Sequence, residues 1–134
     1  MLKYVPTTCP YCGVGCGILL VVKEGQVIDT QPWPGHTVSE GKLCLKGWNS
    51  HQFIHHPERL TKPLIRENGS FREASWEEAI GLVASKLKEI KGGFGPDAIA
   101  FLSSAKCSNE ENYLLQKFAR AVIGTNNIDH CARL

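Results

Sequence analysis

The chain has 134 residues, of which 43% are hydrophobic and 21% charged, and its formal net charge is +2. These values are typical of a globular protein with one domain or two small ones. The charge is small and no basic run occurs, which argues against nucleic acid as a partner. The longest strongly apolar stretch, residues 18–22, is too short to cross a bilayer, and the N-terminus shows no export signal. We therefore expect a cytoplasmic chain without a membrane span.

The first segment, residues 1–56, is rich in glycine and proline and holds four of the six cysteines. Strands are expected over residues 17–22 and 27–30, joined by a turn at Glu24 and Gly25. A segment with so few core residues needs additional stabilisation, which a metal site would supply.

The second segment, residues 57–134, opens with two short strands, 64–66 and 70–72, around an Asn-Gly turn. Ser75 and Glu78 form a capping box that begins a helix, and Gly92-Gly93 is expected to end it. Seven apolar residues of this helix fall on one stripe: Trp76, Ala79, Ile80, Val83, Ala84, Leu87 and Ile90.

Residues 98–131 predict a βαβ unit with a right-handed crossover. Residues 98–102 are continuously apolar, which fits a strand covered on both faces, and residues 128–131 are the returning strand. Between them, Ser108 and Glu111 form a second capping box, and Gly124 closes the helix. The buried face expected for this helix consists of Tyr113, Leu114, Phe118, Ala121 and Val122.

The fold class is therefore α/β (α+β overall), with a small cysteine-rich domain containing β-strands in front of the βαβ unit. Ligands of such sheets gather beyond the carboxyl ends of the strands. Here those ends lead into the loop 103–108 and the C-terminal residues 132–134.

The first segment carries Cys9, Cys12 and Cys16 close together and Cys44 much later. Three thiolates in one loop can ligate three corners of a [4Fe–4S] cluster, and a distant fourth completes the set. The nearby glycines allow the loop to wrap around the cluster. A structural zinc site on the same four thiolates is the alternative, although zinc modules usually show two short cysteine pairs.

Residues 9–17 and 41–47 resemble the N-terminal cluster domain of the molybdopterin oxidoreductases, and within that family the catalytic (alpha) subunits of formate dehydrogenases. Residues 56–64 are similar to the link out of that domain. Residues 104–113 and 124–133 are similar to the first segments of the pterin domain. The resemblance divides the chain into a [4Fe–4S] domain, residues 1–56, and the start of a molybdopterin-binding domain, residues 57–134.

The resemblance implies that the parent protein oxidises formate to CO2 at molybdenum or tungsten held by two pterin guanine dinucleotides. The cluster would pass the electrons to an iron–sulfur or flavin subunit. The lysine after the fourth cysteine lies between cluster and pterin in this family, which makes Lys46 the expected electron relay. The pterin contacts are expected from the loop after the first strand of the βαβ unit, at Ser104, Lys106, Cys107 and Asn109. Lys46 is also expected to contact the pterin.

In the family, the sequence found here at residues 132–134 precedes a metal-ligating cysteine or selenocysteine. We therefore expect a truncation at a selenocysteine codon, and a 134-residue piece that is inactive alone. Another molybdopterin oxidoreductase, such as a nitrate reductase, is an alternative within the family. A stand-alone electron-transfer or zinc-binding module is the alternative from another class.

Overall fold

The computed structural model describes residues 1–131, which form two compact units. Unit 1 comprises Met1–Arg59, Ser103–Leu114 and the chain from His130, and unit 2 comprises Leu60–Leu102 and Leu115–Asp129. Helices and strands occur in both, so the predicted mixture of α and β structure is confirmed. In the part of the chain that is described, no helix has the length and apolar character needed to span a membrane.

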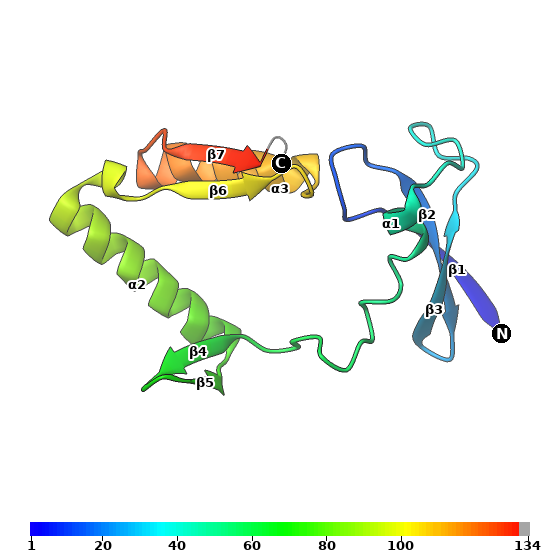
Figure 1. The fold of residues 1–134 in the computed structure, drawn as a ribbon, viewed down its shortest axis with the longest axis horizontal. Coiled ribbons are helices and arrows are strands. Elements are labelled where there is room, and N and C mark those ends of the chain that lie inside the picture. The colour runs from blue at the N-terminus through cyan, green and yellow to red at the C-terminus, as the bar shows by residue number, and fades with distance from the viewer. Residues whose placement is uncertain (132–134) are drawn as a thin grey trace. The chain divides into compact units, whose positions relative to one another are not determined.

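Unit 1 contains a three-stranded antiparallel sheet in the order β1 (Leu2–Thr8), β2 (Gly17–Lys23) and β3 (Gln26–Pro32) (Figure 1). The predicted strands β2 and β3 are confirmed. So is their turn, where Glu24 and Gly25 have φ of 51° and 82°, the left-handed values of a tight hairpin turn.

Strand β1 was not predicted. Every residue of β1 is exposed, so it lacks the alternation of buried and polar residues that identifies a strand. It also contains Pro6, which cannot donate to the sheet and is tolerated because β1 lies at the edge.

Helix α1 (Leu45–Trp48) follows Cys44 directly. The Thr30 hydroxyl in β3 and the Ser50 hydroxyl just after α1 lie 3.2 Å apart, and both residues are buried. A buried pair of hydroxyls that satisfy one another holds this region against the sheet.

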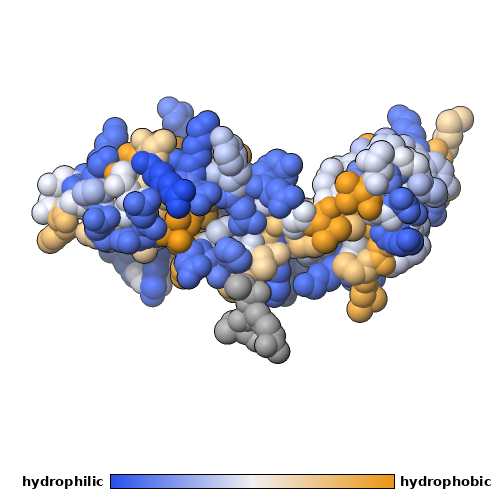
Figure 2. All heavy atoms as spheres, turned by 90° about the horizontal axis from the view of Figure 1, so that it is seen from above, coloured by the Kyte–Doolittle hydropathy of each residue, from blue (hydrophilic) through white to orange (hydrophobic). Residues whose placement is uncertain are grey.

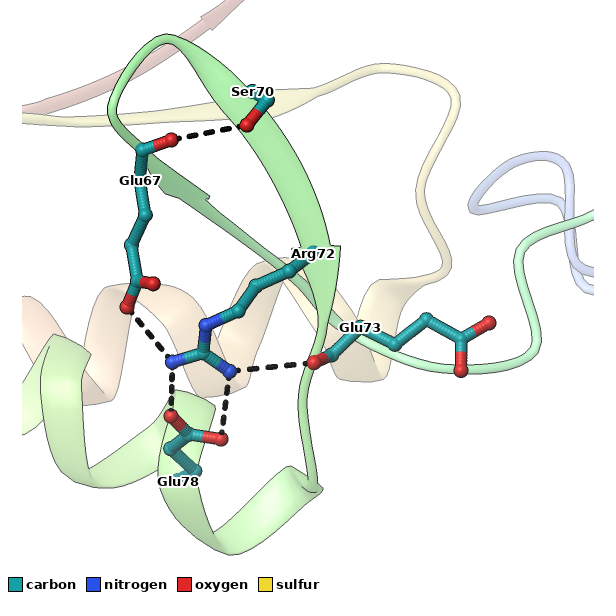
Figure 3. A network of polar contacts seen from close by, with 5 residues as sticks. All are labelled: Glu67, Ser70, Arg72, Glu73 and Glu78. Atoms are coloured by element: carbon teal, nitrogen blue, oxygen red, sulfur yellow. Dashed lines mark hydrogen bonds and ion pairs between the residues drawn. The ribbon is translucent and has the colours of Figure 1, made fainter.

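Unit 2 begins with the antiparallel hairpin of β4 (Leu64–Glu67) and β5 (Ser70–Glu73). The predicted turn is confirmed, since Asn68 and Gly69 have φ of 50° and 86°. Arg72 of β5 donates hydrogen bonds to the carboxylates of Glu67 and Glu78 (Figure 3). The guanidinium holds the pKa of both carboxyl groups below the usual value. The network therefore ties the hairpin to the next helix at neutral pH and weakens as the carboxyl groups become protonated.

Helix α2 (Trp76–Phe94) begins as predicted, because the Ser75 hydroxyl accepts a hydrogen bond of 3.1 Å from the Glu78 amide. The predicted end at Gly92-Gly93 is wrong. The helix continues through Phe94 and ends at Gly95, whose φ is 84° and whose amide donates to the Lys91 carbonyl. Glycine readily takes a positive φ where a helix ends, and of these three glycines only Gly95 does so.

The apolar stripe of α2 lies at the surface of the described chain. The side chains of Trp76, Ile80 and Val83 are 68%, 62% and 59% exposed, and no residue of α2 is buried within residues 1–131. Apolar side chains also stand out among hydrophilic ones on the face drawn in Figure 2. The predicted helical period is therefore correct, while the described chain covers the stripe only in part, at Ala79 and Leu87.

The βαβ pattern is present as β6 (Phe101–Ser104), α3 (Asn109–Lys117) and β7 (Ile128–Cys131), and β6 pairs with β7. The two strands run in the same direction in Figure 1, as predicted for a parallel pair. The first strand begins later than predicted, because Pro96–Ala98 forms a short 3-10 helix. It is also not covered on both faces in the described chain, since Leu102 is 84% exposed.

The buried face predicted for the second helix is wrong except at Phe118, which is partly buried and contacts the Phe101 ring. Tyr113, Leu114 and Val122 are mostly exposed, whereas Ala119 and Ile123 are buried. For Val122 the reason is a π-helix, η2 (Phe118–Ile123), that continues α3. Its wider turn rotates the side chains away from the face expected from a 3.6-residue period. The predicted stop is confirmed, because Gly124 has φ of 91° and donates to the Ala119 carbonyl at 2.9 Å.

Replacing Ser75 by Ala should lower the free energy of unfolding by about 1 kcal/mol, because the helix start loses its side-chain acceptor. Urea denaturation followed by circular dichroism measures this. Ser85→Ala is the matched control, since the Ser85 hydroxyl only donates to the Leu82 carbonyl within the same helix and alanine is the better helix former. Equal losses for the two variants would contradict the capping role.

Candidate metal-cluster site

Three of the predicted ligands lie in one loop between β1 and β2. The Cys9 amide donates to the Cys16 carbonyl at 2.8 Å, which closes the loop at its base. Within the loop, the Gly15 amide donates to the Cys12 carbonyl at 3.4 Å, and Gly15 takes a φ of 68°. A left-handed residue is needed to turn the chain back, so this glycine is required by the backbone itself.

The base of this loop is fastened to the segment that leads toward Cys44. The Gly17 amide donates to both His36 Nδ1 and Ser39 Oγ, each at 3.2 Å. A Cβ atom at Gly17 would lie 2.3 Å from the His36 ring, so no larger residue fits. Neither His36 nor Ser39 was predicted to take part, because only the folded chain brings them to Gly17.

Cys44 lies immediately before α1, where backbone N–H groups lack partners within the helix. The N–H groups of Gly47 and Lys46 lower the pKa of the Cys44 thiol, and the charge of Lys46 adds to this. The thiolate is the form that ligates metal. Cys44, the fourth predicted ligand, is exposed. Its lowered pKa favours the thiolate.

The pKa of the Cys9 thiol depends on the other three predicted ligands. Burial raises the pKa of Cys9, the Tyr11 amide lowers it, and the thiols of Cys16, Cys12 and Cys44 each raise it. Thiolates repel one another only when they lie within electrostatic reach. Cys12 and Cys16 from the loop, and Cys44 from the start of α1, therefore lie within electrostatic reach of Cys9.

The donor set suits an iron–sulfur cluster. All six cysteines are free, and four thiols on glycine-rich loops are the usual ligands of a [4Fe–4S] cluster. Within residues 1–131, no three His, Cys, Asp or Glu side chains lie close enough to share a single metal ion. The cluster would be held by Cys9, Cys12, Cys16 and Cys44.

Lys46 lies in α1 and is exposed, and it borders a surface hollow of about 460 Å³ together with Tyr11 and Phe53. Tyr11 belongs to the three-cysteine loop, so Lys46 lies beside the predicted ligands. Its role as a relay toward the pterin stays a prediction.

The predicted pterin residues lie at the end of β6. The Ser104 hydroxyl accepts from the Lys106 amide at 3.0 Å and lies 3.6 Å from the Cys131 sulfur. That hydroxyl lowers the pKa of the Cys131 thiol, with a further contribution from the Ala105 amide. Cys107 is partly buried. These residues share one loop as expected, and their contacts with a pterin stay predictions. Residues 132–134, expected at the same edge, lie outside the described residues.

Asn109 has a contact that was not predicted. Its side-chain amide donates to the Gly13 carbonyl in the three-cysteine loop at 2.8 Å. No sequence signal indicates this pairing, because the two residues are 96 positions apart.

Comparison with known proteins agrees with this site. Residues 2–56 match the model of the molybdopterin oxidoreductase Fe4S4 domain, and residues 59–134 match the model of the molybdopterin oxidoreductases. The fold is similar to that of acetylene hydratase from Pelobacter acetylenicus, with a TM-score of 0.72, 23% identity, and coverage of 93% of this chain and 18% of that one.

Curated relatives include the F420-dependent formate dehydrogenase 2 subunit alpha of Methanococcus maripaludis, 57% identical over 98% of this chain and 19% of the relative. The corresponding alpha subunit of Methanocaldococcus jannaschii is 56% identical over the same shares. The chain thus spans about a fifth of the length of these relatives. With both parts of the chain matched in order, the chain belongs to the molybdopterin oxidoreductase family, and its first part is the family's Fe4S4 domain.

Proposed function

We propose that the chain is the N-terminal part of a formate dehydrogenase catalytic (alpha) subunit, in which Cys9, Cys12, Cys16 and Cys44 hold a [4Fe–4S] cluster. The observation that carries this proposal is the match of residues 2–56 to an Fe4S4 domain. Within it, Cys12, Cys16 and Cys44 all lie close enough to Cys9 to raise the pKa of its thiol. The names of the alpha-subunit relatives support formate as the substrate.

In the parent protein, formate would lose two electrons and a proton and become CO2. The molybdenum or tungsten pterin centre would accept the electrons when bound. Residues 1–56 would form the cluster domain and residues 57–134 the start of the pterin domain. By themselves, residues 1–134 would bind the cluster without oxidising formate, since they span 19% of the relative's length.

The residues of this chain would hold the cluster and guide its electrons. Cys9 is only 6% exposed, so its surroundings would limit the access of water to a bound cluster, which would affect the potential. Lys46 would provide positive charge beside Cys44, where reduction adds negative charge. Free cysteines are usual in a reducing compartment, which supports a cytoplasmic location. An iron–sulfur or flavin subunit would accept the electrons.

Anaerobically prepared protein should contain about four iron and four sulfide per chain and be brown. Cys44→Ser should lose most of the iron, because the cluster loses its ligand from outside the loop. Cys107→Ser, which changes a cysteine outside the predicted set, is the control and should retain the iron. Stoichiometric zinc without iron, or full iron content in Cys44→Ser, would contradict the cluster assignment.

Two of the predicted ligand thiols, Cys9 and Cys44, should respond differently to pH in the metal-free protein. The pKa of Cys9 is raised and that of Cys44 is lowered, and alkylation requires the thiolate. As the pH falls, iodoacetamide should therefore stop modifying Cys9 first and Cys44 last, as followed by peptide mass spectrometry. The reverse order would show that Cys44 is not stabilised as a thiolate.

Lys46→Met in the full-length parent should slow formate-dependent dye reduction roughly tenfold, equivalent to a barrier increase of about 1.4 kcal/mol, without loss of iron. Lys46→Arg should retain most activity, because the charge remains. Lys42→Met is the control, an exposed lysine on the other side of Cys44. A wild-type turnover rate in Lys46→Met would contradict the proposed relay role of Lys46. A full-length parent that does not oxidise formate would contradict formate as the substrate.

A further inference from the structure

The loop with three predicted cluster ligands is held at its tip as well as at its base. Asn109 Nδ2 donates a 2.8 Å hydrogen bond to the Gly13 carbonyl, which lies between Cys12 and Cys16. Both residues belong to unit 1. The bond therefore links the cluster loop to the first turn of α3, in the part of the chain that matches the pterin domain.

Asn109 lies in a helix turn that is stabilised by hydrogen bonds of its neighbours. The Ser108 amide donates to Glu111 Oε2 at 2.7 Å, and the Glu111 amide donates to Ser108 Oγ at 3.2 Å. This reciprocal capping box satisfies the free amides of the helix start. One turn later, Asn112 Nδ2 donates to the Ser104 carbonyl at 3.2 Å. The Asn109 side chain is thus not needed to cap the helix and is available for the hydrogen bond to Gly13.

The shape of Gly13 matches this contact. A Cβ atom at Gly13 would lie 2.5 Å from Asn109 Oδ1, far inside normal contact distance. Gly13 is not among the glycines with a positive φ, so its own backbone angles do not demand glycine. Gly15 in the same loop is the opposite case, with left-handed angles and nothing within 4 Å of an added Cβ atom. A side chain at position 13 would therefore have to displace the Asn109 amide, while the backbone angles would permit it.

We propose that Asn109 is a positioning residue for the cluster: its hydrogen bond to Gly13 fixes the loop that presents Cys12 and Cys16. This inference rests on the proposed cluster function. The bond holds the peptide group after Gly13, and hence the direction of its dipole, within the ligand loop. Dipoles and N–H groups around the sulfurs set the potential of a cluster. Asn109 would therefore influence both the retention of the cluster and its reduction potential.

The test uses the full-length parent with four changes: Asn109→Ala, Gly13→Ala, the double variant, and Gln116→Ala as an exposed amide on the same helix. Iron content, the rate of iron release to a chelator, and the midpoint potential from an EPR-monitored titration are measured. Asn109→Ala should retain its iron but release it about two- to tenfold faster, the change expected for one lost hydrogen bond. Its midpoint potential should shift, and Gln116→Ala should match the wild type.

The double variant separates positioning from general damage. The added methyl group in Gly13→Ala should displace the Asn109 amide, so this variant should resemble Asn109→Ala. Combining the two changes should cost little more than either alone, because both break the same contact. An unchanged release rate and potential in Asn109→Ala, or fully additive effects, would overturn the inference. A wild-type parent without iron would instead overturn the proposed function.

Discussion

The proposed cluster site depends on bringing four thiols together around one centre, which the protein alone does not favour. The raised pKa of Cys9 shows the difficulty, since burial and three neighbouring thiols all oppose its charge. Iron ions would reverse this balance, because they bind thiolates and neutralise their repulsion. The fully buried residues of the sheet are few, led by Ile18 and Thr30. A bound cluster would thus contribute directly to the stability of this small unit.

The surrounding contacts reduce the freedom of the ligand loops before any metal binds. The Cys9–Cys16 backbone bond closes the base of the loop. Gly17, with His36 and Ser39, joins that base to the segment before Cys44. Each contact restricts one loop end, so less conformational entropy remains to be lost when the site forms. Sites prepared in this way bind more tightly and with a more uniform geometry.

Local features were predicted well from the sequence. The hairpin turns at Gly25 and Gly69 and the cap at Ser75 each depend on a few neighbouring residues, and all are present. The features that were missed depend on distant partners. The contact of Asn109 with Gly13 exists only in the folded chain, and strand β1 has no buried face that a pattern could reveal. The π-helix at 118–123 shifted the buried face because its turn departs from the usual period.

In the site, too, the sequence predicts local features but not contacts between distant residues. Spacing and resemblance predict the four cysteines as ligands, because three of them occur in one short loop and glycines flank them.

The decisive measurement is a crystal structure of the anaerobically prepared protein with an anomalous difference map at the iron absorption edge. We expect strong iron density enclosed by the sulfurs of Cys9, Cys12, Cys16 and Cys44. A single isolated metal peak, or iron bound without the Cys44 sulfur, would contradict it.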